Sequence, residues 1–204
     1  MLELDDMERD ALTEVFNIGV GQAASAMSQM VNDRVELSVP SISFTSRAAA
    51  ALELTHDAGQ RICGVSQRFQ GSFEADAILM FPENKSLEIV RLMIGDDMPI
   101  EELTAMEQEA LTEIGNIILN ALIGTLANVF GSEFSSSLPA FHFGTSSEIL
   151  QAERKNADDL VMLLHVDFKL ETHQINGYVA FLLDVSSVQG LRDSINRFMG
   201  NIAR

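Results

Sequence analysis

The sequence predicts an α/β chain made of two homologous halves that share one hydrophobic core. The chain has 204 residues, of which 47% are hydrophobic and 21% are charged, so it can bury a sizeable core. Residues 10–44 align without a gap with residues 109–143. Each copy starts a segment with the same predicted order: a long helix, several strands and an amphipathic helix. The linker between the segments, 95–102, is short, so the halves are expected to share a core.

The repeat preserves particular polar residues as well as apolar periodicity. ALTE, two variable residues and Asn-Ile occur in both copies. We therefore expect a single domain over residues 1–204, with repeat halves at approximately 1–97 and 103–204. The identical pairs are Ala11/Ala110, Leu12/Leu111, Thr13/Thr112, Glu14/Glu113, Asn17/Asn116, Ile18/Ile117, Ser38/Ser137, Pro40/Pro139 and Phe44/Phe143.

Each half is predicted to begin with a long helix, because apolar residues recur there at helical spacing. The two helices are expected over 7–31 and 105–130. A capping box is expected at each start and a glycine stop after the second helix. The expected cap residues are Asp5 with Glu8, Thr104 with Glu107, and Gly131.

Strands follow each long helix, and an amphipathic helix closes each half. The segments 35–44 and 134–143 both indicate a strand interrupted by proline. Two longer strands are then expected in each half, at 61–70 and 73–81, and at 160–170 and 175–184. The closing helices are expected over 84–95 and 187–200, and the connections 45–60 and 145–157 are expected to occupy equivalent places.

The charge balance restricts the class of partner. Thirty acidic residues against 13 basic ones give a formal net charge of -17. This argues against nucleic acid or an anionic membrane as a partner, because both need a basic footprint. The acidic N-terminus lacks the basic and apolar regions of a signal peptide, and no uninterrupted apolar run reaches the roughly 18 residues of a membrane span.

The single cysteine, Cys63, indicates a reducing compartment, because no intramolecular disulfide is possible. We therefore expect a cytoplasmic protein. Cys63 alternates with apolar neighbours on an expected strand, which favours a buried small hydrophobe over a reactive thiol.

The Glu and Asn of the repeat are the candidate functional residues. Glu14 and Asn17 lie three positions apart on an expected helix, as do Glu113 and Asn116, so each pair shares one helix face. We expect both asparagines to lie exposed on this face, close to the Glu of the same pair. A single such pair is usually a solvated polar face. Two copies favour a function, because asparagine is a mediocre helix former and a solvated helix gives no reason to prefer it twice.

The chemistry open to such a pair is narrow. No His or Cys lies within a turn of either pair, and Asn cannot titrate. Asn can hold a water through hydrogen bonds, and positioning an attacking water is much of the task in phosphoryl transfer. If the phosphoryl group and Mg²⁺ belong to a partner protein, the Glu can anchor a Lys or Arg of that partner.

The pattern Asp/Ser-x-x-x-Glu-x-x-Asn, followed after 22 residues by Pro, resembles the signature of the CheC/CheX/FliY phosphatases of chemotaxis. The resemblance covers essentially the whole chain, and two copies are typical of CheC-type members. CheX-type members have one copy, and FliY carries an additional flagellar-switch domain. The first copy consists of Asp10, Glu14, Asn17 and Pro40, and the second of Glu109, Glu113, Asn116 and Pro139, with Glu109 replacing Asp or Ser.

The resemblance implies a pseudo-twofold CheC-like fold, in which the long helices pack on a shared β-sheet. It also implies hydrolysis of the aspartyl phosphate of phospho-CheY, with Asn17 and Asn116 orienting water and Glu14 and Glu113 holding a lysine of the regulator. No metal or cofactor is expected on this chain, and Mg²⁺ is expected on the regulator. CheD is an expected second partner. The alternatives are a weakly active adaptor that binds CheD or a regulator, and a flagellar-switch module.

Two weaker signals have simpler interpretations. The stretch GVGQAA at 19–24 fits a loose dinucleotide-binding pattern, but it lies within an expected helix, where small residues favour close packing. His142, His165 and His173 lack metal-ligand spacing.

Overall fold

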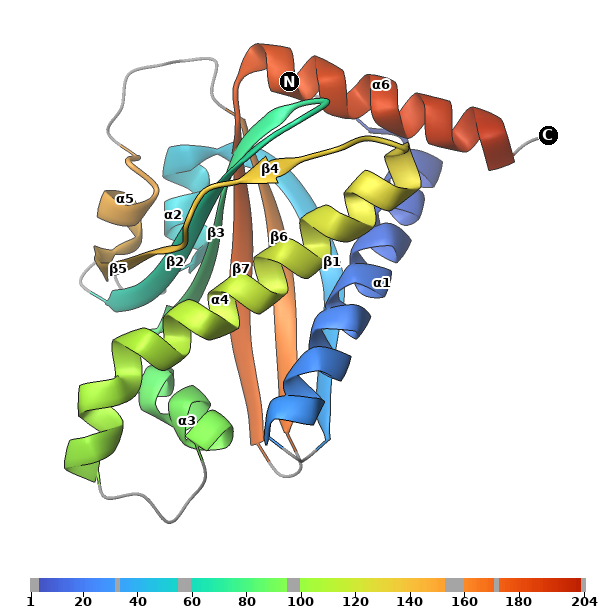
Figure 1. Cartoon of the computed structure of the whole chain (residues 1–204). Helices are drawn as coiled ribbons and strands as arrows, with labels where there is room; N and C mark the ends of the chain where they lie inside the picture. Colours follow the sequence, from blue (N-terminus) through green and yellow to red (C-terminus); the bar gives the residue numbers. More distant parts are fainter. Residues whose placement is uncertain are drawn as a thin grey trace.

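The computed structural model describes residues 4–31, 34–54, 60–94, 100–152, 160–170 and 173–202 (Figure 1). This part of the chain contains six helices and seven strands and confirms the predicted α/β class. In chain order they are α1 (Asp6–Val31), β1 (Val35–Ser46), α2 (Arg47–Leu54), β2 (Arg61–Gln70), β3 (Glu74–Pro82), α3 (Glu83–Ile94), α4 (Ile100–Phe130), β4 (Ser135–Ser136), β5 (Ala140–Thr145), α5 (Ser146–Ile149), β6 (Leu160–Leu170), β7 (His173–Leu183) and α6 (Val185–Ile202).

The helix ends test the predicted caps. Asp5 and Glu8 form the expected reciprocal capping box at α1: Asp5 N donates to Glu8 Oε2 at 2.9 Å, and Glu8 N donates to Asp5 Oδ1 at 2.8 Å. The predicted box of Thr104 and Glu107 is wrong, because α4 already begins at Ile100 and both residues lie inside it. Residues 95–99 of the expected linker lie outside the described residues, and the remainder belongs to α4.

The end of α4 is a glycine stop, as predicted. Gly131 has a φ of +61°, which favours a residue without Cβ. Ser132 N donates to Ala127 O at 2.9 Å, and Gly131 N donates to Asn128 O at 3.4 Å. These two bonds satisfy carbonyls that have no partner within the helix.

The two halves exchange their first strands within one seven-stranded antiparallel sheet. The strand order is β1-β6-β7-β3-β2-β4, and β5 also pairs with β2. Strand β1 of the first half therefore pairs with the β6–β7 hairpin of the second half, and β5 pairs with the β2–β3 hairpin of the first. Strands β3 and β7 join the two hairpins at the centre. Neither half completes its own part of the sheet.

Helices cover both faces of this sheet. Buried residues of α1, α3, α4 and α6 form the larger core against one face, and α2 and α5 cover the other with a smaller core. In Figure 1, α4 crosses diagonally in front of the sheet, and α1 lies beside it. Gly19 of α1 allows the two helices to approach, since a Cβ there would lie 3.2 Å from the Leu122 Cα. This confirms close helix packing as the reason for Gly19, whereas a Cβ at Gly21 would meet no atom within 4 Å.

The two long helices approach the sheet differently. The repeat aligns Phe16 of α1 with Gly115 of α4. Phe16 is fully buried and packs against Phe181 of β7 with ring centroids 5.6 Å apart. A Cβ at Gly115 would instead lie 2.5 Å from the Val65 Cβ of β2. The backbone of α4 thus rests directly on β2, whereas a phenyl ring separates α1 from the sheet.

Helix α4 is also unusually apolar. Its stretch Met106–Phe130 is long and apolar enough to cross a membrane by composition alone. Half of the most apolar window is buried inside the protein. The apolar character of α4 is therefore explained by its packing against the sheet on one side and α1 on another.

The contact of α4 with β2 predicts that Gly115→Ala is destabilising. The added Cβ would overlap the Val65 side chain, and overpacking of this kind costs about 1–3 kcal/mol. Gly124→Ala on the same helix is the matched control, because a Cβ there meets no atom within 4 Å. It should raise the free energy of unfolding by up to about 1 kcal/mol, since alanine favours helix. Urea unfolding measures both changes, and equal effects would contradict the close approach.

Candidate functional site

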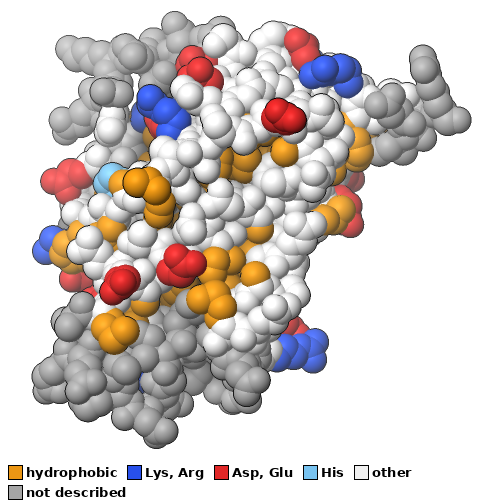
Figure 2. Space-filling view, viewed as in Figure 1, with side chains coloured by type: hydrophobic (Ala, Val, Ile, Leu, Met, Phe, Trp, Pro, Cys, Tyr) orange, Lys and Arg blue, Asp and Glu red, His pale blue; other side chains and the backbone are white. Residues whose placement is uncertain are grey.

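The four predicted site residues lie on the two long helices. Glu14 and Glu113 are exposed, as expected, and Asp10 and Glu109 are exposed one turn earlier. The two asparagines were expected to be exposed as well, and this was wrong, because both are part-buried. On the face of α1 and α4 seen in Figure 2, acidic side chains stand singly among hydrophobic and uncharged ones, with Lys and Arg toward the margins. The carboxylates therefore face solvent, while the carboxamides are partly covered by the protein.

In the first half, Asn17 binds the backbone of β1. Asn17 Nδ2 donates to Val39 O at 3.3 Å, and Asn17 Oδ1 accepts from Val39 N at 2.9 Å. Nδ2 also donates to Thr13 O, one turn earlier on α1, at 3.0 Å. Both amide hydrogens of Asn17 thus have acceptors within the protein, and only its oxygen has capacity for a further hydrogen bond.

The proline of the motif explains why β1 needs this asparagine. Pro40 has no backbone N–H, and the pairing of β1 with β6 shifts register between Ser38 and Ser41. Val39 lies within this interruption and is only 1% exposed, so its N–H and C=O need partners other than the β6 strand. Asn17 supplies both. The Asn–Pro spacing therefore has a structural reason in the first half, apart from any role in chemistry.

In the second half, Asn116 binds side chains instead of the strand backbone. Asn116 Oδ1 accepts from Gln67 Nε2 of β2 at 3.2 Å and from Asn120 Nδ2 at 2.8 Å. No described residue accepts a hydrogen bond from Asn116 Nδ2. Asn116 can therefore donate to a molecule outside the protein, whereas both lone pairs of its oxygen are occupied.

The segment before Pro139 differs accordingly. Gln67 Nε2 donates to Ser137 O at 3.1 Å, so Gln67 lies between α4 and this segment. Leu138 is the repeat partner of Val39, yet it is 88% exposed. The residue before the proline is thus an exposed apolar side chain in the second half and a buried one in the first.

Gln67 and Asn120 were not among the predicted site residues. Asn120 could have been found, because it lies one turn after Asn116 on the same helix face. Gln67 could not, because it belongs to the other half and only the fold brings β2 under α4.

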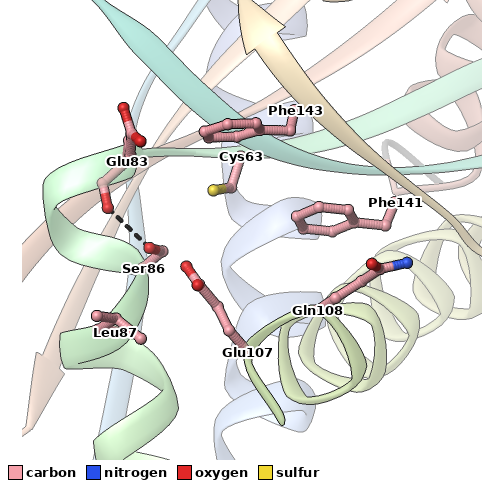
Figure 3. A pocket seen from close by; sticks show the side chains of 8 residues that line it. All are labelled: Cys63, Glu83, Ser86, Leu87, Glu107, Gln108, Phe141 and Phe143. Carbon is pink, nitrogen blue, oxygen red and sulfur yellow. Dashed lines mark hydrogen bonds between the residues drawn. The ribbon is translucent and has the colours of Figure 1, made fainter. Parts of the chain in front are cut away.

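A separate cavity of about 520 Å³ lies between α3, the start of α4, β2 and β5 (Figure 3). None of the four predicted site residues lines it. Burial, and secondarily the charge of Glu107, raises the pKa of Cys63 to about 11. Cys63 is 3% exposed, which confirms it as a buried thiol. The lining residues are Cys63, Glu83, Ser86, Leu87, Glu107, Gln108, Phe141 and Phe143.

His142 and His165 have structural neighbours, and the side chain of His173 lies outside the described residues. His142 Nε2 lies 2.7 Å from Ser66 Oγ, and burial lowers the pKa of His142. His165 stacks on Tyr178 with ring centroids 5.0 Å apart. Across the described part of the chain, no cluster of three or more His, Cys, Asp or Glu side chains could hold a metal ion.

Comparisons with known proteins match two family models. Residues 63–164, half of the chain, match the family described as Chemotaxis phosphatase CheX, and residues 7–44 match the CheC-like family. The CheY-P phosphatase CheC of Bacillus subtilis (strain 168) is 28% identical over 139 residues, which cover 67% of this chain and 66% of that protein.

FliY provides two further similarities. The Flagellar motor switch phosphatase FliY of Bacillus subtilis (strain 168) is 24% identical over 175 residues, covering 85% of this chain and 45% of that protein. This chain thus spans less than two thirds of either Bacillus relative. The crystal structure of Thermotoga maritima FliY has a TM-score of 0.78 and 17% identity, and the match covers 97% of this chain and 100% of that one. This likeness concerns the fold.

The hydrogen bonds of Asn17 predict a loss of stability in Asn17→Ala. The buried N–H and C=O of Val39 would lose their partner, which costs about 1–3 kcal/mol. The Val39 amide hydrogen should also exchange faster with solvent. Ser25→Ala, at an exposed position of α1, is the control and should change stability by less than about 0.5 kcal/mol. Urea unfolding and amide hydrogen exchange measure these effects, and an unchanged Val39 amide would contradict the bond.

The environment of Cys63 predicts a slow thiol. Alkylation requires the thiolate, and a pKa of about 11 instead of 9.0 reduces the thiolate at pH 8 by about 100-fold. Reaction with iodoacetamide should therefore be at least about 100-fold slower in the folded protein than in urea. Mass spectrometry over time measures both rates, and similar rates would show that the thiol is accessible.

Proposed function

Because this chain belongs to the CheC and CheX family of chemotaxis phosphatases, we propose that it hydrolyses the aspartyl phosphate of a CheY-like response regulator and so terminates a chemotaxis signal. The observation that carries this proposal is the placement of two Glu–Asn pairs on the solvent side of α1 and α4, with both carboxylates exposed. The name of the Bacillus subtilis relative, CheY-P phosphatase CheC, supports the same substrate.

The proposed roles follow from the chemistry of each side chain. The regulator supplies the phosphoryl group and Mg²⁺. Glu14 and Glu113 accept charge-assisted hydrogen bonds from a lysine of the regulator and so set its position. Asn17 and Asn116 orient a water for attack on phosphorus.

The reaction forms a bond between the water oxygen and phosphorus and breaks the bond between phosphorus and the aspartate oxygen. The products are inorganic phosphate and the free carboxylate of the regulator. The protons of the water remain on the phosphate or are released to solvent. No phosphoryl group is transferred to this chain in this proposal, because each glutamate carboxylate is engaged by the lysine of the regulator and the water is the attacking group. A cytoplasmic location and CheD as a second partner are parts of the same proposal.

A flagellar-switch role is the second candidate, and the FliY relative favours it. The alignment covers only 45% of FliY, so the similarity does not extend to the rest of that protein. Phosphatase activity without assembly on flagellar proteins would distinguish the first candidate from the second.

The proposal predicts that the two asparagines act in separate sites. Asn17→Ala and Asn116→Ala should each retain part of the rate, and the double variant should lose on the order of 100-fold in kcat, because no side chain then orients the water. The KM for the regulator should change little. Phosphate release from a phosphorylated CheY-like regulator measures both constants.

The glutamates provide the contrasting variants and Glu53 the control. Glu14→Ala with Glu113→Ala should raise KM by about 10-fold, because each lost bond is intermolecular. Glu53→Ala, exposed on α2 at the opposite face of the sheet, should change neither constant. A phosphorylated adduct of this chain, or asparagine variants that lose binding alone, would refute the proposed roles.

A further inference from the structure

We propose that Gln67 is a positioning residue for the second site, where it holds Asn116 with its oxygen toward the protein and its NH₂ group outward. This inference rests on the proposed function, because it specifies how Asn116 meets the water. Gln67 belongs to β2 of the first half, and Asn116 to α4 of the second. The second site is therefore assembled from both halves of the repeat.

Two backbone carbonyls determine the orientation of the side chains that contact Asn116. Gln67 Nε2 donates to Ser137 O at 3.1 Å, and Asn120 Nδ2 donates to Asn116 O at 2.7 Å. A carbonyl only accepts hydrogen bonds, so the NH₂ groups of Gln67 and Asn120 must face these oxygens. Asn120 Nδ2 also donates to Gln67 Oε1 at 3.2 Å, which agrees with both orientations.

The orientation of Asn116 then follows. Gln67 and Asn120 both direct their NH₂ groups at the Asn116 carboxamide, so the atom that faces them must be its oxygen. Its nitrogen consequently points away. The Asn116 NH₂ group can donate to one lone pair of a water, and the other lone pair remains available to attack phosphorus.

The burial of Gln67 makes this arrangement rigid. Gln67 is 3% exposed, and a buried amide is costly unless it is hydrogen-bonded. Its Nε2 has two acceptors and its Oε1 has a donor, so rotation of the amide would break three hydrogen bonds. The close approach of α4 at Gly115, beside Asn116, brings the helix within reach of Gln67.

The first half lacks both positioning side chains. Ser66 pairs with Ala140, and His165 pairs with Ser41, which is the repeat partner of Ala140. Ser66 and His165 therefore occupy equivalent places in the two halves. The residues that follow them, Gln67 of β2 and Val166 of β6, are equivalent as well. Asn120 is equivalent to Gly21. Without them, Asn17 binds Val39, and only its oxygen can form a further hydrogen bond. The first site therefore offers a water an acceptor, and the second site offers it a donor.

The kinetic test uses proteins with one site each. In an Asn17→Ala background only the second site remains, and Gln67→Met should lower kcat on the order of 10-fold with little change in KM, because Asn116 is no longer held. Gln67→Glu should have a similar effect, since a carboxylate of the same shape cannot donate to Asn116 Oδ1. An apolar residue at this position suits the fold, because Val166 occupies the equivalent place. Phosphate release from a phosphorylated CheY-like regulator is the assay.

The Asn116→Ala background is the matched control. Gln67→Met should add no further loss there, because Gln67 acts only through Asn116. An equal loss in both backgrounds would indicate general destabilisation and overturn the proposal, as would an unchanged kcat in the Asn17→Ala background. Absence of activity in the wild-type protein would refute the proposed function instead.

A measurement without substrate tests the positioning separately. The side-chain amide of Asn116 should be rigid by ¹⁵N relaxation in the wild-type protein and more mobile in Gln67→Met. The Asn17 side-chain amide, which Val39 holds, should stay rigid in both proteins. An Asn116 amide that remains equally rigid without Gln67 would overturn the proposal, whatever the phosphatase assay shows.

Discussion

The exchange of first strands between the two halves is the constraint on which the rest of the structure depends. Strand β1 can complete its hydrogen bonds only on β6, and β5 only on β2, within the described sheet. Each long helix is followed by the exchanged strand of its own half, so α1 lies over the hairpin of the second half and α4 over that of the first. A residue on α4 consequently finds its partners on β2. The halves cannot be separated without exposing unpaired strand edges.

The asparagine of the motif belongs to the structure around the proline, independently of any role in chemistry. Each proline interrupts a strand next to a long helix, and the polar backbone groups at the interruption need partners. In the first half the asparagine supplies them directly at Val39. In the second half Gln67 takes over this task at Ser137, which releases Asn116 from the strand. A carboxamide suits both roles, because it donates and accepts hydrogen bonds without changing charge.

The two sites differ because the two copies of the repeat carry different residues around the same Glu and Asn, and therefore pack differently on the sheet. Phe16 keeps α1 away from the sheet, and Gly115 lets α4 rest on it. This difference decides whether the asparagine binds the neighbouring strand or a side chain of the sheet beneath. It also determines which face of the carboxamide meets solvent, and whether the residue before the proline is buried like Val39 or exposed like Leu138.

Local patterns in the sequence were sufficient for the α/β class, the repeat and most of the elements. Strands 61–70 and 160–170 were predicted with their observed ends, and the Asp5–Glu8 cap was correct, because alternation and caps depend on neighbouring residues. The start of α4 was missed, because a favourable cap sequence lies inside a helix that packing extends. The strand exchange, the part-burial of both asparagines and the role of Gln67 were decided by the tertiary structure. Those features depend on contacts between distant residues, and a buried glutamine on a strand has no sequence pattern that names its partner.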